Sequence, residues 1–235
     1  MRCAIYFIPP KHDPLTLAAT RWIGRDAYGN EQVEPGTIEG LVEEDRAFLT
    51  APVRRFGFHG TLRAPFQLVE GHTLDALSRA LGRFAKSTPS ILVPHIEIAA
   101  LSNFFCLVPR HPSHELDALA FRIVETFDGY RAPMSEAELE RRYPVQLTER
   151  QHANLLAWGH PYVGADYRFH MSLTGPVPPE ERAYVRAVLE RHFGALLCRP
   201  LVVDQIALFY ESEPLAPMRI HSVHSLMQAE SRRRA

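Results

Sequence analysis

Residues 56–62 read FGFHGTL, and residues 169–174 read FHMSLT. In both stretches an aromatic residue is followed by histidine, one intervening residue, a hydroxyl residue and leucine. Because side chains alternate between the two faces of a strand, the first stretch predicts His59, Thr61 and Arg63 on one face and apolar side chains on the other. The polar face can line an opening while the apolar face packs on a helix.

The second stretch repeats this alternation. His170 and Ser172 fall on its polar face, and Arg168 precedes them on the same face. A strand buried on both faces would carry a nearly continuous apolar run instead. Two strands of this kind therefore predict a shared polar opening.

Working outward, both halves of the chain run in the order strand, helix, connection, histidine-bearing strand, helix, strand. The two histidines lie 170 − 59 = 111 residues apart, at equivalent places in this order. We predict an α+β fold: a bilobal, pseudo-symmetric duplicated unit whose antiparallel sheets line a central cleft, with helices on the outside. It forms a single domain over residues 1–235, with repeat halves at 1–101 and 104–226.

Apolar spacing and capping residues set the expected elements. Leucines at positions 74, 77 and 81 and Phe84, for example, follow the period of an amphipathic helix. The predicted helices cover residues 13–22, 42–49, 73–86, 113–127, 135–158 (a polar insertion) and 178–193. The predicted strands cover residues 2–8, 56–68, 91–101, 104–109, 167–174, 202–210 and 218–223.

The two histidines suit acid–base chemistry on a phosphate ester. Histidine has an ordinary pKa of about 6.5, so it can give or take a proton near neutrality. Opening a phosphodiester needs one group to deprotonate the attacking water and another to protonate the leaving oxygen. We predict that His59 and His170 are this catalytic pair. The residues do not decide which is the acid.

The neighbouring polar side chains are predicted to bind the substrate phosphate. Thr61 and Ser172 lie two residues after the histidines, where their hydroxyls can donate to phosphate oxygens. Arg63 is expected to stabilise the negative charge that builds there. Tyr6 is a further candidate for a substrate hydrogen bond, with a buried strand tyrosine as the alternative.

The composition excludes several classes of protein. The net charge of −1, from 26 basic and 27 acidic side chains, argues against a broad surface for nucleic acid. Three scattered cysteines form no CxxC and favour a reducing cytoplasm. The chain contains no GxxxxGK[ST] or GxGxxG, and its other histidines lack co-ligand spacing, so no cofactor and no metal is predicted. No apolar run approaches the roughly 18 residues of a membrane span, and residues 231–234 are expected to form a frayed basic tail.

The two motifs, His59-Gly60-Thr61 and His170-Met171-Ser172, resemble those that define the two-histidine (2H) phosphoesterase superfamily. That resemblance implies a bilobal α+β fold and cyclic phosphodiesterase or RNA-end activity without a metal. Further stretches resemble a narrower branch of unknown function, linked to phosphonate metabolism by gene neighbourhood. They are RCAIYF (2–7), WIGRD (22–26), FGFHGTL (56–62) and WGHPYV (158–163).

Several alternatives remain open at this point. The expected partner is a small phosphorylated substrate, such as a ribosyl cyclic phosphate from phosphonate breakdown; a short RNA end is the alternative. A non-catalytic module that binds a phosphorylated ligand is the competing class. No membrane and no obligate protein partner is predicted. Trp22 and Trp158 are expected as core anchors, with stacking on a sugar or base as the alternative.

Overall fold

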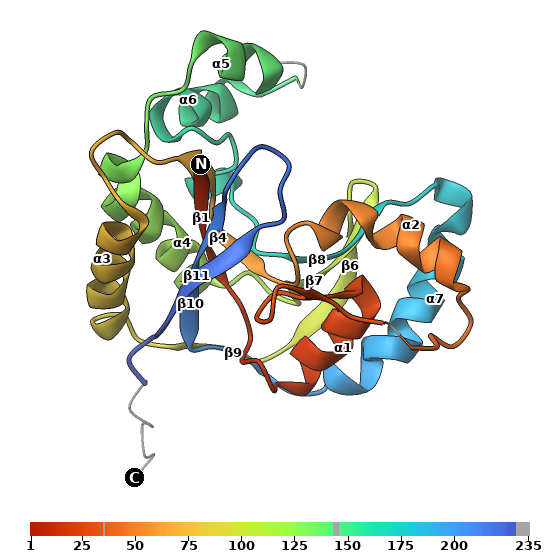
Figure 1. Cartoon of the computed structure of the whole chain (residues 1–235). Coiled ribbons are helices and arrows are strands. Elements are labelled where there is room, and N and C mark those ends of the chain that lie inside the picture. The colour runs from red at the N-terminus through yellow and green to blue at the C-terminus, as the bar shows by residue number, and fades with distance from the viewer. Residues whose placement is uncertain (35, 143–145, 229–235) are drawn as a thin grey trace.

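The computed structural model describes residues 1–34, 36–142 and 146–228 of the 235-residue chain. Within these residues, two larger antiparallel sheets are surrounded by helices (Figure 1). Two short antiparallel pairs complete the strands. The predicted α+β fold class, with antiparallel sheets and external helices, is confirmed.

The larger sheet has four strands in the order β11-β10-β1-β4, so that β4 is an edge strand. Helices α3 and α4 pack against it. The strands are β1 (Arg2–Phe7), β4 (Gly60–Gln67), β10 (Gln205–Glu211) and β11 (Arg219–Ser225), and the helices are α3 (Leu74–Lys86) and α4 (His114–Phe127).

The second sheet has three strands in the order β6-β7-β8, with β8 at its edge, and α1, α2 and α7 pack against it. Its elements are β6 (Ile96–Leu101), β7 (Phe104–Pro109), β8 (Met171–Pro176), α1 (Pro14–Ile23), α2 (Glu43–Arg54) and α7 (Arg182–Phe193). The short pairs are β5 (Ile91–Val93) with β9 (Leu201–Val203), and β2 (Arg25–Asp26) with β3 (Glu31–Gln32).

Each large sheet takes strands from both predicted halves of the chain. The four-stranded sheet joins β1 and β4 to the C-terminal strands β10 and β11, whereas the β6–β7 hairpin pairs with the later strand β8. The predicted halves, 1–101 and 104–226, therefore do not form one sheet each. A duplicated origin stays a prediction.

Local signals set several helix ends as expected. The Asp13 carboxylate accepts a hydrogen bond from the Leu15 amide (2.8 Å) at the start of α1, and Gly24 ends that helix at φ +77°. The Thr73 side chain caps α3 in the same way. Helix α2 extends to Arg54, beyond the predicted end at residue 49, and contains Pro52.

Both histidine-bearing strands begin later than predicted. They start at Gly60 and Met171, so His59 and His170 each lie immediately before a strand. Gly57, at φ +73°, interrupts extended backbone before the first, and the 3-10 turn η2 (Gly164–Asp166) comes before the second. The expected strands at 56–68 and 167–174 are therefore too long at their N-terminal ends.

The predicted polar insertion forms two helices, α5 (Glu136–Arg142) and α6 (Glu149–Trp158), which lie together at one end of the molecule (Figure 1). Part of the insertion, 143–145, and the predicted basic tail at 231–234 lie outside the described residues. The remaining 3-10 turns are η1 (Asp128–Tyr130), η3 (Pro179–Glu181) and η4 (Gly194–Leu196). Among the described helices, none has the length and apolar character to cross a bilayer.

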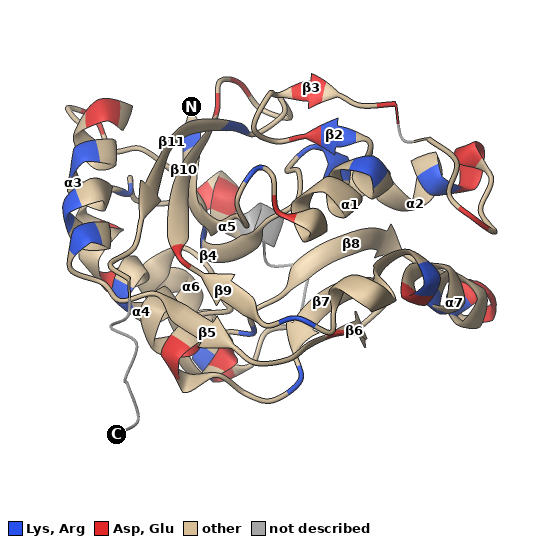
Figure 2. Ribbon diagram, turned by 90° about the horizontal axis from the view of Figure 1, so that it is seen from below, with Lys and Arg blue, Asp and Glu red and all other residues tan. Residues whose placement is uncertain are grey.

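Charged side chains of both signs lie on the outer helices. Figure 2 shows basic residues along α3, where Arg79, Arg83 and Lys86 follow the single acidic residue Asp75, and residues of both signs on α7. Acidic side chains elsewhere balance these, since the chain has a net charge of −1.

Candidate active site

The two histidine motifs are in direct contact. A Cβ at Gly60 would lie 2.6 Å from two ring carbons of Phe169, so the backbone of the first motif rests against the aromatic residue of the second. The Tyr167 hydroxyl donates to the Thr61 carbonyl oxygen at 2.7 Å and ties the segments together. The edges of the two sheets therefore meet where the histidines lie.

His59 is held from three sides. Its Nδ1 lies 2.9 Å from the Gly57 carbonyl oxygen, and the Thr61 hydroxyl oxygen is 3.3 Å from its Nε2. The ring stacks on Tyr6, with 3.9 Å between centroids and 27° between planes. The imidazole is thus fixed in both position and rotation.

His170 repeats the backbone contact of His59. Its Nδ1 lies 2.8 Å from the carbonyl oxygen of Arg168, two residues earlier, and Phe104 packs near its ring. A carbonyl oxygen only accepts, so Nδ1 of each neutral ring must carry the proton. In both histidines Nε2 is therefore the nitrogen left for chemistry, and at His59 the Thr61 hydroxyl donates to it.

Burial sets the charge of His59. Loss of hydration lowers its pKa to about 4, helped by the nearby charges of His170 and Arg25, while the Gly57 hydrogen bond opposes the shift. At neutral pH His59 is consequently uncharged.

The two predicted hydroxyl residues lie beside their histidines. Thr61 lines the cavity described below and contacts His59 directly. Ser172 is half-buried on β8 opposite Cys106, two residues after His170, and is not among the residues that line the cavity. Their role as phosphate ligands stays a prediction.

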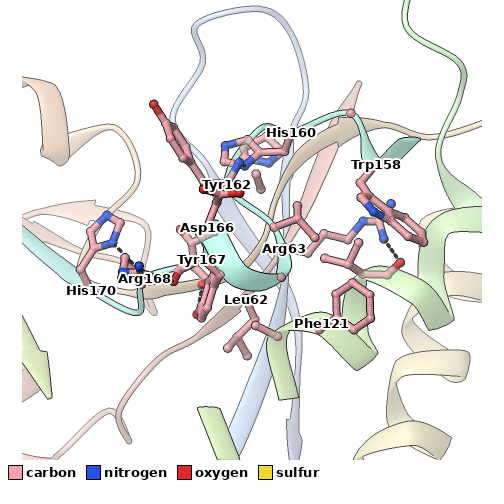
Figure 3. Close-up of a pocket in the computed structure, with 18 of the residues that line it drawn as sticks. Leu62, Arg63, Phe121, Trp158, His160, Tyr162, Asp166, Tyr167, Arg168 and His170 are labelled. Atoms are coloured by element: carbon pink, nitrogen blue, oxygen red, sulfur yellow. Dashed lines mark hydrogen bonds between the residues drawn. The ribbon is translucent and has the colours of Figure 1, made fainter. Parts of the chain in front are cut away.

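Arg63 lines the cavity described below, as Thr61 does (Figure 3). The register between β1 and β4 shifts near it, so that Thr61 pairs with Tyr6 and Arg63 pairs with Ile5. Arg63 is 3% exposed, and its guanidinium donates to the Val124 carbonyl and to Asp128. Its role in stabilising charge on a substrate phosphate stays a prediction.

The charge of Arg63 is balanced locally. Burial alone would raise the pKa of Asp128, but hydrogen bonds from Arg131 and Arg63 hold it below its usual value. The hydrogen bonds of Arg63 to Val124 and Asp128 hold β4 against α4 and the turn that follows it.

Tyr6 also differs from its predicted role. It is 1% exposed, burial raises the pKa of its phenol, and its ring supports His59 rather than lining the cavity. The alternative of a buried strand tyrosine is confirmed. Trp22 is a core residue as predicted, with its indole N–H donating to the Leu173 carbonyl at 2.8 Å.

A cavity of about 340 Å³ is lined by His170 and by Thr61, the neighbour of His59; His59 itself is not among the lining residues. Arg168 lies near His170 in its wall, and Phe121 and Trp158 lie together at another part (Figure 3). Val124 and Tyr162 also line it. Trp158 packs edge-on against Phe121 at 5.9 Å between centroids. Trp158 therefore lines the cavity, and its stacking on a sugar or base, the alternative left open by the sequence, stays a prediction.

Ion pairs fix the charged groups of the cavity wall. Asp166 binds Arg150 at 2.6 Å, and the Asn154 amide donates to the carbonyls of Pro161 and Val163. The segment after α6 is thereby held in place as a wall. Sequence reasoning missed Tyr167 and Phe121, which reach the site from a turn and from the face of α4 and carry no local signal.

Metal binding finds little support in the side chains. Among the residues that the structure describes, no three His, Cys, Asp or Glu side chains are grouped closely enough to hold an ion. In His59 and His170, moreover, Nδ1 is hydrogen-bonded to a backbone carbonyl oxygen.

Comparison with known proteins gives a family without an assigned activity. A family model described as "Protein of unknown function (DUF1045)" matches residues 61–219. The chain is 36% identical over 220 residues to a protein of Janthinobacterium sp. (strain Marseille) named ribose 1,5-bisphosphate phosphokinase PhnN, covering 92% of this chain and 49% of that protein. It is 32% identical over 234 residues to a protein of the same name from Laribacter hongkongensis (strain HLHK9), covering 98% of this chain and 53% of that protein.

The chain thus spans about half the length of the curated relatives that it matches. Among solved structures, it is similar to one described as a phosphoesterase, with a TM-score of 0.44 and 14% identity over 97% of this chain and 98% of that one. At this TM-score the likeness says nothing about activity.

Proposed function

This chain belongs to the DUF1045 family of proteins of unknown function, and from its site we propose that it is a metal-independent phosphodiesterase that opens a small cyclic phosphate ester. The observation that carries the proposal is the matched pair of histidines. Each presents Nε2 while a backbone carbonyl two residues earlier holds Nδ1. The proposal agrees with the two motifs that resemble those of the 2H phosphoesterases.

The different surroundings of the two rings support a division of roles between them. His59 has a pKa near 4, so it is neutral in the working range and is the base. His170, in the segment before β8, is then the acid. Thr61 keeps His59 Nε2 aligned through its hydroxyl until substrate enters.

The reaction follows from these roles. As a water oxygen forms its bond to phosphorus, His59 Nε2 takes the proton from that water. The bond between phosphorus and one ring oxygen of the ester breaks, and His170 Nε2 gives its proton to the departing oxygen. The product is a phosphomonoester with a free hydroxyl. His59 then releases its proton to solvent and His170 regains one, which restores both groups.

The cavity indicates what the ester carries. Its wall combines a positive charge from Arg168 near His170 with apolar and aromatic surface from Phe121 and Trp158. The names of the relatives point to ribose phosphates, so a ribose cyclic phosphate is the first substrate to test. The aromatic wall specifically favours the second candidate, a nucleoside 2′,3′-cyclic phosphate or short RNA end, because a base can stack there.

A turnover assay tests the proposal. Purified protein is incubated with ribose cyclic phosphates, 2′,3′-cyclic nucleotides and short cyclic-ended RNA, and phosphomonoester formation is followed by phosphorus NMR. Loss of either member of an acid–base pair costs roughly 10²–10⁴ in rate. We expect His59→Ala and His170→Ala each to lose at least that much with binding largely kept. His12→Ala, at an exposed histidine, is the matched control.

Two results would contradict the proposal. Hydrolysis unchanged in both histidine variants would remove the paired mechanism, whereas binding without turnover by the wild-type protein on every substrate would favour a ligand-binding module. EDTA tests the metal-independent chemistry separately. Activity lost in EDTA and restored by zinc would overturn that part.

A further inference from the structure

Arg25 is a buried arginine outside the cavity, at the root of the loop that carries His59. It belongs to β2, is 5% exposed, and does not line the cavity. Burial lowers the pKa of its guanidinium. Such a group is costly to bury, and it persists only where hydrogen bonds compensate.

Four oxygen atoms surround the Arg25 guanidinium. Nη1 donates to the carbonyls of Arg54 (3.1 Å) and Arg55 (2.6 Å), at the C-terminal end of α2. Nη2 donates to the Asn30 side chain (2.9 Å) and to the Met218 carbonyl, just before β11. The fork thus clamps the end of a helix to a segment of the four-stranded sheet.

The clamped carbonyls lead directly into the catalytic loop. Two residues after Arg55 the chain reaches Gly57, whose carbonyl holds His59 Nδ1 at 2.9 Å. The loop has little freedom there, since a Cβ at Gly57 would lie 2.8 Å from the Ala27 methyl group, two residues after Arg25. The segment from Arg25 to Ala27 therefore also packs directly against Gly57.

We propose that Arg25 is a positioning residue for His59: its grip on the carbonyls of Arg54 and Arg55 fixes the loop so that Gly57 holds the Nδ1–H form of the imidazole and Nε2 faces the substrate. The inference rests on the proposed function, in which His59 is the base. It goes beyond that function by naming what maintains the base in its reactive form.

The charge of Arg25 acts in the same direction as its geometry. Two charged groups act on His59, namely His170 from the segment before β8 and Arg25 from β2, and both lower its pKa after the larger effect of burial. Tyr6, stacked on the ring from β1, stays neutral because burial raises its pKa. Arg25 accordingly opposes protonation of the ring that it helps to orient.

Two substitutions separate geometry from charge. Arg25→Lys keeps the positive charge but loses the planar guanidinium that donates to several carbonyls at once. Arg25→Gln loses both the charge and the guanidinium. Arg46→Lys is the matched control, because Arg46 is 3% exposed and donates to the Trp22 carbonyl and Glu43 rather than to the loop. Asn30→Gly removes one acceptor of the Arg25 fork; glycine suits the backbone there, at φ +54°.

The first readout is the His59 imidazole itself, followed by nitrogen-15 NMR across a pH titration of the full chain. In Arg25→Lys we expect signals of both tautomers in place of the Nδ1–H form alone. In Arg25→Gln we also expect the His59 pKa to rise by about one unit, because a repelling charge is gone. Arg46→Lys should leave both properties as in the wild type.

The second readout is kinetic. Both Arg25 variants should lower kcat by at least about tenfold while KM changes less than about threefold, because Arg25 does not touch the cavity. Wild-type tautomer and pKa of His59 in the folded Arg25 variants would overturn the inference. If those variants do not fold, Asn30→Gly decides: partial tautomer mixing supports the inference, and an unchanged ring overturns it. If the Arg25 variants change the His59 NMR signals but the wild-type protein turns over no substrate, the proposed function is contradicted while the positioning role of Arg25 is supported.

Discussion

Replacing Gly60 by alanine adds one methyl group where the two histidine motifs touch. The added carbon would lie 2.6 Å from two ring carbons of Phe169 and 3.5 Å from Met171 Cγ. Carbon atoms prefer about 3.5–4.0 Å, so the ring or the strand must move by roughly 1 Å. Phe169 is 5% exposed and packs near Phe7, which leaves the ring little room to retreat.

The magnitude follows from this overlap. Overpacking a well-packed core costs about 1–3 kcal/mol, and we expect about 2 kcal/mol for Gly60→Ala. The catalytic effect should be larger, because Phe169 directly precedes His170 and Gly60 directly follows His59. A displacement of about 1 Å in a catalytic group can cost roughly 10²-fold in rate, so we expect kcat/KM to fall by about that factor.

A double-mutant cycle with Phe169→Leu isolates the contact. Leucine lacks the two ring carbons that meet the new methyl group, so the double variant should recover about 1–2 kcal/mol relative to the sum of the single changes. Urea unfolding measures stability, and cyclic phosphate hydrolysis measures activity. Gly194→Ala is the control, since a Cβ there meets nothing within 4 Å.

Additive effects of Gly60→Ala and Phe169→Leu would refute the reasoning, because independent sites do not share a clash. So would a Gly60→Ala variant with wild-type stability and activity. Either result would mean that the two motifs are not pressed together as described.

Three further expectations concern charge and recognition. Arg63→Met should lower stability by about 1–3 kcal/mol, seen in urea unfolding, since Asp128 loses a partner; a KM within about threefold of the wild-type value would show that Arg63 does not bind the substrate phosphate. The pKa of His59 is about 4 in the folded protein and about 6.5 in the unfolded chain, so the unfolded chain binds more protons between these two pH values. The free energy of unfolding should therefore rise with pH across that window, by at most about 3 kcal/mol. His59→Gln should flatten this slope. Trp158→Ala should raise KM for 2′,3′-cyclic nucleotides by about 5–150-fold, matching the loss of one stacking contact of about 1–3 kcal/mol, with kcat nearly unchanged; an equal effect on ribose cyclic phosphates would count against base stacking.

The sequence predicted the parts of the site that depend on repeated short patterns. The two aromatic-histidine-hydroxyl motifs lie against each other through Gly60 and Phe169, as expected, and the capping residue Asp13 marked the start of a helix. That His59 and His170 act as a catalytic pair stays a prediction. Pattern and local chemistry suffice there because each feature is encoded within a few neighbouring residues.

The errors come from long-range pairing. The register shift between β1 and β4 depends on how these two strands meet, and strand exchange between the halves depends on where β10 docks. Residue types around these positions do not specify either. Tyr6 was placed on the correct strand, but its stacking beneath His59 arises from a contact 53 residues along the chain.

The central claim is that the two imidazoles act on one phosphorus atom. Orthovanadate, which can adopt the five-coordinate geometry of the reacting phosphate, can be titrated into nitrogen-15-labelled protein while the Nε2 signals of both rings are observed. We predict that the signals of His59 and His170 shift together along one saturation curve, and that replacing either ring weakens the response of the other. A shift confined to one histidine, or two curves with different midpoints, would contradict the account.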